Sequence, residues 1–163
     1  MATESAVAKA KVGSEQFLSF VLPPDQKVIV STKQLIEILN ISLGQIVPIP
    51  DVPPFVMGVC NWRGEVLWVA DLGYMLGFEP LYQQGFTQTT YKVILLRSQG
   101  QTLGLAVRNV QQMVWCNPEQ IQASSDSYVT SELSSCIQGY YLSPDRELML
   151  VLDGDALFQT MDA

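Results

Sequence analysis

Two segments of the chain, half its length apart, follow the same residue pattern, and this repeat limits the folds open to it. They read RGEVLWVADLGYML at 63–76 and DRELMLVLDGDALF at 145–158. Each pattern starts at a turn and continues with an acidic residue, an apolar strand, a helix-capping aspartate and a short apolar helix. The two aspartates, Asp71 and Asp153, lie 82 residues apart in a chain of 163.

A second pair of similar segments supports the repeat. VIVSTKQLIEIL at 28–39 matches LGLAVRNVQQMV at 103–114. Two β-rich units of under about 80 residues each would be marginal alone, because small domains bury too little surface. Packed together or exchanging strands, they would bury one common core. The repeat therefore predicts two small barrels related by a pseudo-twofold axis; the alternative is a chance similarity between two β-hairpins.

Local patterns predict the elements inside these units. We expect a flexible tail at residues 1–15 and one domain of two interlocked barrels at 16–163. STKQLIEILN at 31–40 predicts one or two helical turns running into a strand, with Ser31 or Thr32 as the N-cap. The clearest hairpin has strands at 56–62 and 65–70.

Charge and composition restrict the class of partner. The net charge is -7 and the pI is about 4.4, which argues against nucleic-acid binding, because phosphate contacts need clustered Lys and Arg. Residues 110–163 carry one basic and eight acidic side chains, which either steer basic partners or simply keep the protein soluble. Only 15% of residues are charged and 48% are hydrophobic, which indicates either apolar surface kept for partners or a β-rich core. The start of the chain lacks a secretory pattern and no run is long enough for a membrane span, so we expect a cytoplasmic protein without membrane insertion.

The chain lacks the usual groups of a catalytic or metal site. It has no histidine, which removes the commonest general base and the commonest metal ligand, and it has no phosphate-binding glycine loop. Asp153, Gly154 and Asp155 weakly resemble part of a calcium loop, but a helix cap explains them without an ion. We therefore predict no enzyme, no cofactor and no metal. A small-ligand-binding β-barrel or a paired-carboxylate hydrolase is the alternative.

Arg63 is the most informative polar residue, because it stands at the tip of an apolar hairpin. Gly64 beside it would supply the positive φ that a tight bend requires. From the residues alone, the Arg63 guanidinium either braces the fold by binding carbonyl groups or binds the carboxylate of a partner.

The segment VPIPDVPPFVMGVCNWRGEVLWVADLGYMLG at 47–77 resembles the central motif of the CheW-like family. The resemblance extends over the whole chain, from FLSFVL at 17–22 to LMLVLDGDALF at 148–158. It implies a mainly β fold of two intertwined, five-stranded SH3-like barrels with a few short helices. It also implies a non-enzymatic adaptor that couples methyl-accepting chemoreceptors to a CheA-type histidine kinase by binding the kinase's CheW-like regulatory domain. Such an adaptor would be a monomer alone and would join arrays at the inner face of the membrane with its partners.

The resemblance also implies roles for single residues. Asn61, Arg63 and Gly64 match the turn implicated in receptor contact. A segment implicated in binding the kinase or another partner corresponds to Leu35, Glu37 and Ile38. By analogy, the second half of the chain would contribute groove residues at Val107, Val110 and Val114.

This chain departs from the family pattern at several positions. Trp62 replaces the usual leucine, Trp68 stands where proline is favoured, and Gly73 stands where a basic residue is common. These changes favour partners other than ordinary swimming-chemotaxis receptors. In these features the sequence resembles CheW-like proteins of phototaxis or type IV pilus motility. A CheW-like module in a kinase pathway unrelated to motility is the other alternative.

Overall fold

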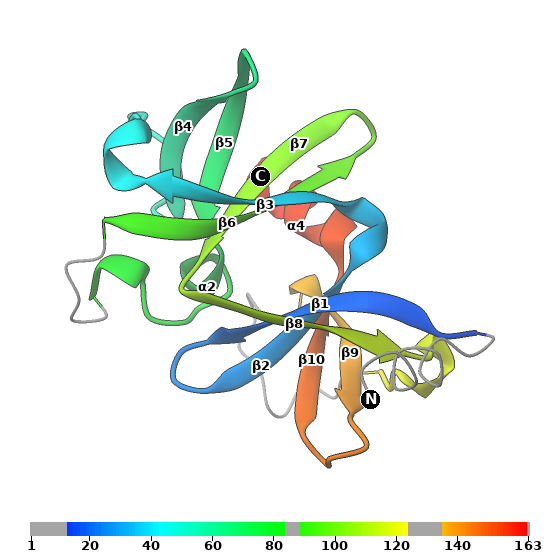
Figure 1. The fold of residues 1–163 in the computed structure, drawn as a ribbon. Coiled ribbons are helices and arrows are strands. Elements are labelled where there is room, and N and C mark those ends of the chain that lie inside the picture. The colour runs from blue at the N-terminus through cyan, green and yellow to red at the C-terminus, as the bar shows by residue number, and fades with distance from the viewer. Residues whose placement is uncertain (1–12, 84–88, 124–134, 163) are drawn as a thin grey trace.

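The computed structural model describes residues 13–83, 89–123 and 135–162, and these residues form two five-stranded sheets (Figure 1). The first barrel contains β1 (Glu15–Leu22), β2 (Gln26–Ser31), β8 (Asn109–Cys116), β9 (Ile137–Leu142) and β10 (Leu148–Leu152). The second barrel contains β3 (Leu35–Ser42), β4 (Val56–Trp62), β5 (Glu65–Asp71), β6 (Thr90–Ser98) and β7 (Gln101–Val107). The chain thus starts in the first barrel, builds the whole second barrel and returns, so the two are intertwined.

The two sheets have the same topology, strand for strand. Their orders are β8-β1-β2-β10-β9 and β3-β6-β7-β5-β4. In each sheet the third and fourth strands pair in parallel, β2 with β10 and β7 with β5, and every other neighbouring pair is antiparallel. The predicted fold class of two intertwined five-stranded barrels with pseudo-twofold symmetry is confirmed. The repeated segments also occupy equivalent strands of the two sheets, as predicted.

Both faces of the central hairpins are buried, which explains the high apolar content. In β1, Leu18 and Phe20 belong to a core shared by the two barrels, while Phe17 belongs to the interior of the first barrel. In β6, Ile94 lies in the shared core and Val93 in the interior of the second barrel. Successive side chains of a strand point to opposite faces, so each of these hairpins forms a wall between two cores.

Each barrel is closed by a backbone bridge at a glycine. Val47 pairs with Val59 beside Gly58, and Gln122 pairs with Tyr140 beside Gly139. A Cβ on Gly58 would lie 2.2 Å from the carbonyl oxygen of Val47, and a Cβ on Gly139 would lie 2.1 Å from that of Gln122. Only glycine lets the two backbones approach this closely, so the two barrels use the same device at equivalent positions.

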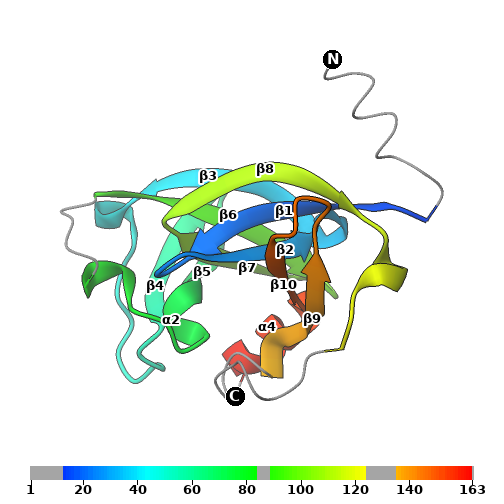
Figure 2. The same cartoon turned by 90° about the horizontal axis from the view of Figure 1, so that it is seen from below.

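Two short helices leave the sheets at the predicted caps. The Asp71 carboxylate accepts a hydrogen bond from the backbone N–H of Tyr74 at the start of α2 (Leu72–Met75). The Asp153 carboxylate accepts from the backbone N–H groups of Asp155 and Ala156 at the start of α4 (Gly154–Asp162). Figure 2 shows both helices on the side of the molecule opposite β3 and β8. Apolar residues of both helices enter the shared core, so each barrel is tied to its neighbour by its own helix.

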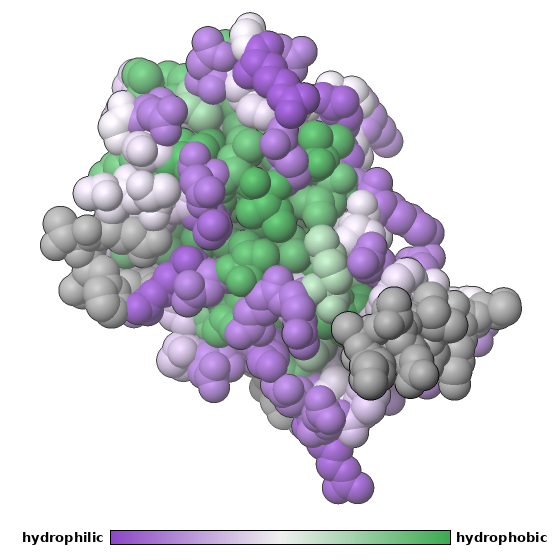
Figure 3. Space-filling model, viewed as in Figure 1, coloured by the Kyte–Doolittle hydropathy of each residue, from purple (hydrophilic) through white to green (hydrophobic). Residues whose placement is uncertain are grey.

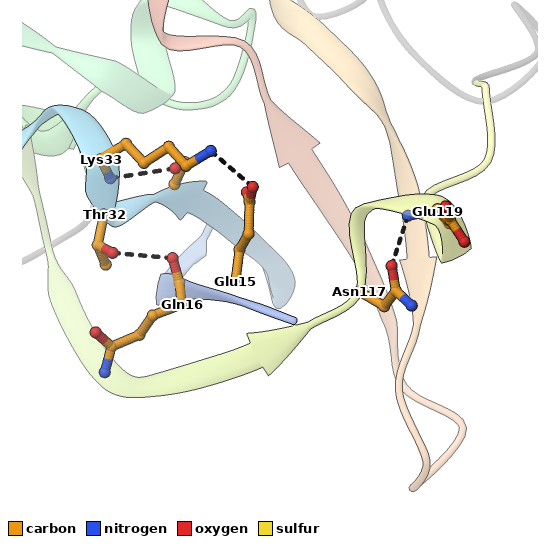
Figure 4. Close-up of polar contacts among 7 residues, drawn as sticks. Glu15, Gln16, Thr32, Lys33, Asn117 and Glu119 are labelled. Carbon is orange, nitrogen blue, oxygen red and sulfur yellow. Dashed lines mark hydrogen bonds and ion pairs between the residues drawn. The ribbon is translucent and has the colours of Figure 1, made fainter. Parts of the chain in front are cut away.

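The segment at 31–40 forms the expected short helical turn and then runs into a strand. A short 3-10 helix, η1 (Thr32–Gln34), links β2 to β3, and the Ser31 side chain caps it by accepting from the backbone N–H of Lys33. The apolar residues after it pair with β6 as part of β3. Figure 4 shows η1 held to β1, where the Thr32 hydroxyl donates to the carbonyl oxygen of Gln16 and Lys33 pairs with Glu15.

The remaining local predictions fall partly outside the described residues. The hairpin strands expected at 56–62 and 65–70 are β4 and β5, and β5 runs one residue further. The first strand already begins at Glu15, inside the expected tail, and residues 1–12 lie outside the described residues. Three further short 3-10 helices are η2 (Leu43–Gln45), η3 (Leu81–Gln83) and η4 (Pro118–Gln120). None of the helices in the described part of the chain has the length and apolar character needed to span a bilayer.

Candidate docking site

An apolar surface lies where the two barrels meet, between β3 and β8. Figure 3 shows a band of hydrophobic residues across this region, with polar residues on both sides. We use the name apolar face for its contributors on the two strands, which are Leu35, Ile36, Ile38, Val110 and Met113.

The register of the strands explains why these residues line up. Ile38 on β3 lies opposite Ile94 on β6, and Met113 on β8 lies opposite Leu18 on β1. Ile94 and Leu18 both point into the shared core. Opposite residues of an antiparallel pair project from the same face, so Ile38 and Met113 extend the shared core outward to solvent.

The pseudo-twofold axis relates the two halves of the apolar face. Leu35 lies opposite Leu96 and Val110 lies opposite Phe20, and both Leu35 and Val110 are partly buried against the shared core. Further out, Ile36, Ile38 and Met113 keep 40%, 36% and 42% of their surface exposed. Monomeric proteins rarely leave a contiguous apolar patch uncovered without a use for it, so this face is a candidate docking surface.

A polar cluster borders the apolar face on the second barrel; we call Glu37, Trp62 and Arg63 the Glu37 cluster. Glu37 Oε1 accepts a hydrogen bond from the indole Nε1–H of Trp62 at 3.1 Å and pairs with Arg63 Nη2 at 3.0 Å. The Arg63 guanidinium carbon lies 5.2 Å from the centre of the Trp62 ring, a cation–π distance. This cluster joins β3 to the end of β4, which are the two outer strands of the same sheet.

The hairpin tip presents Arg63 because of its turn geometry. Arg63 and Gly64 have φ values of 51° and 80°, which define the two-residue turn with both central residues in the left-handed region. The Asn61 side-chain oxygen accepts from the backbone N–H of Gly64 at 2.9 Å and fixes this bend. The Arg63 side chain is 71% exposed, so its pair with Glu37 leaves most of the guanidinium in solvent.

The remaining predicted partner residues lie deeper. Val107 is 1% exposed and belongs to the shared core, so it presents no surface to a partner. Val114 is partly buried and lies opposite Phe17, on the strand side that faces the interior of the first barrel. Ile36 and Met113 were not among the predicted residues. The repeat held the signal for Met113, because aligning 28–39 with 103–114 places it at the position of Ile38.

Asp155 joins three segments at the start of α4. Its Oδ1 accepts from the Ser98 hydroxyl and from Gln34 Nε2, each at 2.7 Å. These hydrogen bonds lower the pKa of Asp155, because they stabilise its charged form. The contacts link α4, β6 and η1 and so help to fix the orientation of one barrel against the other.

A groove of about 450 Å³ lies beside α4, and its lining in the described residues contains no carboxylate, so it does not resemble a paired-carboxylate catalytic site. Its lining residues are Val52, Pro53, Val56, Trp68, Gln101, Thr102, Leu103, Phe158 and Met161. Within the same part of the chain, no group of three or more Cys, Asp or Glu side chains has a metal-binding arrangement.

Comparisons with known proteins identify the family. The family model described as CheW-like domain matches residues 16–162. A curated relative named probable chemotaxis protein CheW, from Rhizobium etli, is 25% identical over 114 residues, which is 70% of each chain. The crystal structure of the scaffolding protein TtCheW from Thermoanaerobacter tengcongensis superposes with a TM-score of 0.71 at 20% identity, covering 85% of this chain and 88% of that one, and shows the same fold. With the family model matching nearly the whole chain, this protein belongs to the CheW-like family.

Proposed function

We propose that this protein is an adaptor that couples methyl-accepting chemoreceptors to a CheA-type histidine kinase. Membership of the CheW-like family makes it a non-enzymatic scaffold or adaptor in chemotaxis signalling. The curated relative carries the name of a chemotaxis protein and the structural neighbour that of a scaffolding protein, and both names support this role. The proposed location is the cytoplasm, at the inner face of the membrane where receptors and kinase assemble.

The observation that carries the proposal is the apolar face at the outer edge of the shared core. It is built from equivalent positions of two barrels and bordered by an exposed arginine, so it offers both apolar contact and a cation. Buried apolar anchors beside an arginine are common at the energetic centre of interfaces. We assign receptor contact to Arg63, with Asn61 and Gly64 shaping its turn. For kinase or other partner contact we assign Leu35, Glu37, Ile38 and Val110, with Val107 and Val114 supporting the strands from inside.

The test is a binding assay with the kinase and the receptor of the same organism. The wild-type protein should capture the CheA-type kinase through its CheW-like regulatory domain, and Arg63→Ala should weaken receptor capture about fivefold while the protein stays folded. Arg63 is mostly exposed, and surface ion pairs contribute only about 0–1 kcal/mol to stability, so the fold should survive.

Arg146→Ala is the matched control. Arg146 stands at the equivalent tip of the first barrel, also with a positive φ of 63°, but belongs to the β9–β10 turn. The Arg146→Ala substitution should leave receptor binding unchanged. If Arg63→Ala unfolds instead, then Arg63 braces the fold and its assignment to receptor contact is wrong.

No observation favours the alternatives over the adaptor. The groove beside α4 lacks converging carboxylates, which the small-ligand reading requires. A CheW-like module in a pathway unrelated to motility would use the same surfaces with another kinase. Deleting the gene distinguishes these two hypotheses. Directed movement should be lost if the protein is an adaptor of phototaxis or pilus motility, and should remain if it serves a pathway unrelated to motility.

A further inference from the structure

Glu37 is held by two donors of different character. The Trp62 indole and the Arg63 guanidinium both reach the same carboxylate oxygen, at 3.1 Å and 3.0 Å. The resembled family motif has leucine at the position of Trp62, and leucine has no N–H to donate. The tryptophan therefore adds a second, independent partner for the carboxylate of Glu37.

The two donors differ in how firmly they are fixed. Trp62 lies on β4 and is partly buried against the core of the second barrel, so its ring has few alternative positions. Arg63 stands at the hairpin tip with a 71% exposed side chain and has several rotatable bonds. An exposed arginine exchanges readily between carboxylates, whereas a packed indole does not.

We propose that Trp62 is a positioning residue that retains Glu37 when Arg63 turns to the carboxylate of a docked partner. This inference rests on the adaptor function proposed above and assigns a regulated step to the same surface. Without Trp62, a partner that takes Arg63 would leave the partly buried Glu37 carboxylate without either of these protein donors, and the loss of these hydrogen bonds would oppose binding. With Trp62 in place, the exchange leaves Glu37 hydrogen-bonded.

Glu37 must stay in place for docking because of its position on β3. Glu37 lies between Ile36 and Ile38, the exposed residues that β3 contributes to the apolar face. A shift of its backbone would move both isoleucines. The partner that fits this arrangement is a protein segment that carries an apolar side chain for the face and an Asp or Glu for Arg63.

A double-mutant cycle in binding tests the proposal. Affinities of wild type, Trp62→Phe, Glu37→Gln and the double variant are measured by titration calorimetry against the cytoplasmic receptor fragment and the kinase regulatory domain of the same organism. Phenylalanine keeps a ring against the core but removes the donor. Trp62→Phe should weaken binding about fivefold, the ratio expected for one hydrogen bond to a charged group at a partly exposed site.

In the Glu37→Gln background, the same tryptophan change should have no further effect, because no charge remains to be retained. Trp68→Phe on β5 is the control and should bind as wild type does, because Trp68 lines the groove beside α4, away from the apolar face. An equal loss from Trp62→Phe in both backgrounds would mean that the ring acts only through packing, and unchanged affinity would remove its role altogether. Either result overturns the inference while leaving the adaptor function in place. If the wild-type protein binds neither partner, the adaptor function fails, and the inference that rests on it fails too.

A second readout uses the isolated protein. In ¹H–¹⁵N spectra, exchange of the Trp62 indole N–H with water should stay slow on Arg63→Ala, because the hydrogen bond to Glu37 remains, and should become faster on Glu37→Ala, which removes the acceptor. Exchange that becomes as fast on Arg63→Ala as on Glu37→Ala would contradict an independent hydrogen bond between Trp62 and Glu37.

Discussion

Replacing Gly58 with alanine should open the second barrel at its closing bridge. The new Cβ would lie 2.2 Å from the carbonyl oxygen of Val47, a separation that real Cβ atoms do not adopt. The contacting atom is backbone, so the clash cannot be relieved by a side-chain rotation. The strand must move away, and the bridge between Val47 and Val59 must break.

The size of the effect follows from what the bridge contains. It has two backbone hydrogen bonds, from Val47 N to Val59 O at 2.7 Å and from Val59 N to Val47 O at 3.0 Å. At about 1 kcal/mol each, their loss costs about 2 kcal/mol of the free energy of unfolding. Gly58 also has φ at 143°, where alanine is strained by about 1 kcal/mol or more. We therefore expect a total loss of about 3 kcal/mol for Gly58→Ala.

Gly139→Ala is the matched test in the first barrel, because it faces an equivalent bridge without the same backbone strain. Its Cβ would lie 2.1 Å from the carbonyl oxygen of Gln122, and the bridge between Gln122 and Tyr140 also has two backbone hydrogen bonds. We expect a loss of about 2 kcal/mol. Gly44→Ala is the control, since a Cβ there meets nothing within 4 Å.

Urea unfolding followed by circular dichroism and tryptophan fluorescence measures all three variants. For a chain of this size, a loss of about 3 kcal/mol corresponds to a fall in melting temperature of about 6–12 °C. If Gly58→Ala falls within about 0.5 kcal/mol of the Gly44→Ala control, the close approach at the bridge is not what requires glycine, and the account of barrel closure is wrong.

Three further outcomes follow from the structure. The native protein should resist thiol alkylation at pH 8 and react after denaturation, because all three cysteines are buried and burial raises the pKa of Cys116 to about 11. Asp155→Asn should lower stability above pH 3.8, the ordinary pKa of the group. Because hydrogen bonds lower the folded-state pKa of Asp155, the difference from wild type should shrink only below pH 3.8, as the pH falls through that lowered folded-state pKa; urea unfolding at several pH values measures it. Phe20→Ala should lower the free energy of unfolding by about 4 kcal/mol, because Phe20 is fully buried in the shared core. The fluorescence of the tryptophans in both barrels should still report a single unfolding transition. Two separate transitions would contradict a common core.

The topology was predictable from sequence because both halves repeat the same local signals. The capping aspartates mark the ends of β5 and β10 in both repeats, and the structure confirms both caps. At 31–40 the sequence predicted a helical turn followed by a strand, but not the residue at which the turn ends. Leu35, Ile38 and Leu39 have spacings that suit a helix as well as a strand, and the deciding factor is pairing with β6, more than 50 residues further along the chain.

The candidate site was predictable only where the residues stand at a turn. Arg63 was correctly predicted at an exposed hairpin tip, because Gly64 indicates a tight bend there. Val107 was expected at a groove only by analogy with the resembled family, and no pattern in the sequence itself placed it there. In β7 both faces are covered, one by the interior of the second barrel and the other by the shared core. Which strands are covered on both faces depends on how the barrels pack, and a single sequence does not reveal that.

The shared core also explains why a docking surface should form between the barrels. Each barrel leaves one edge strand beside the junction, β3 in the second and β8 in the first, and both carry apolar side chains that extend the same core to the surface. A partner bound across Ile38 and Met113 therefore contacts both barrels at once. The side chains beneath it, such as Leu18 and Ile94, are packed from both barrels as well. A partner docked there would stabilise one relative orientation of the two barrels, and this is the physical reason for proposing the junction rather than either barrel end as the docking surface.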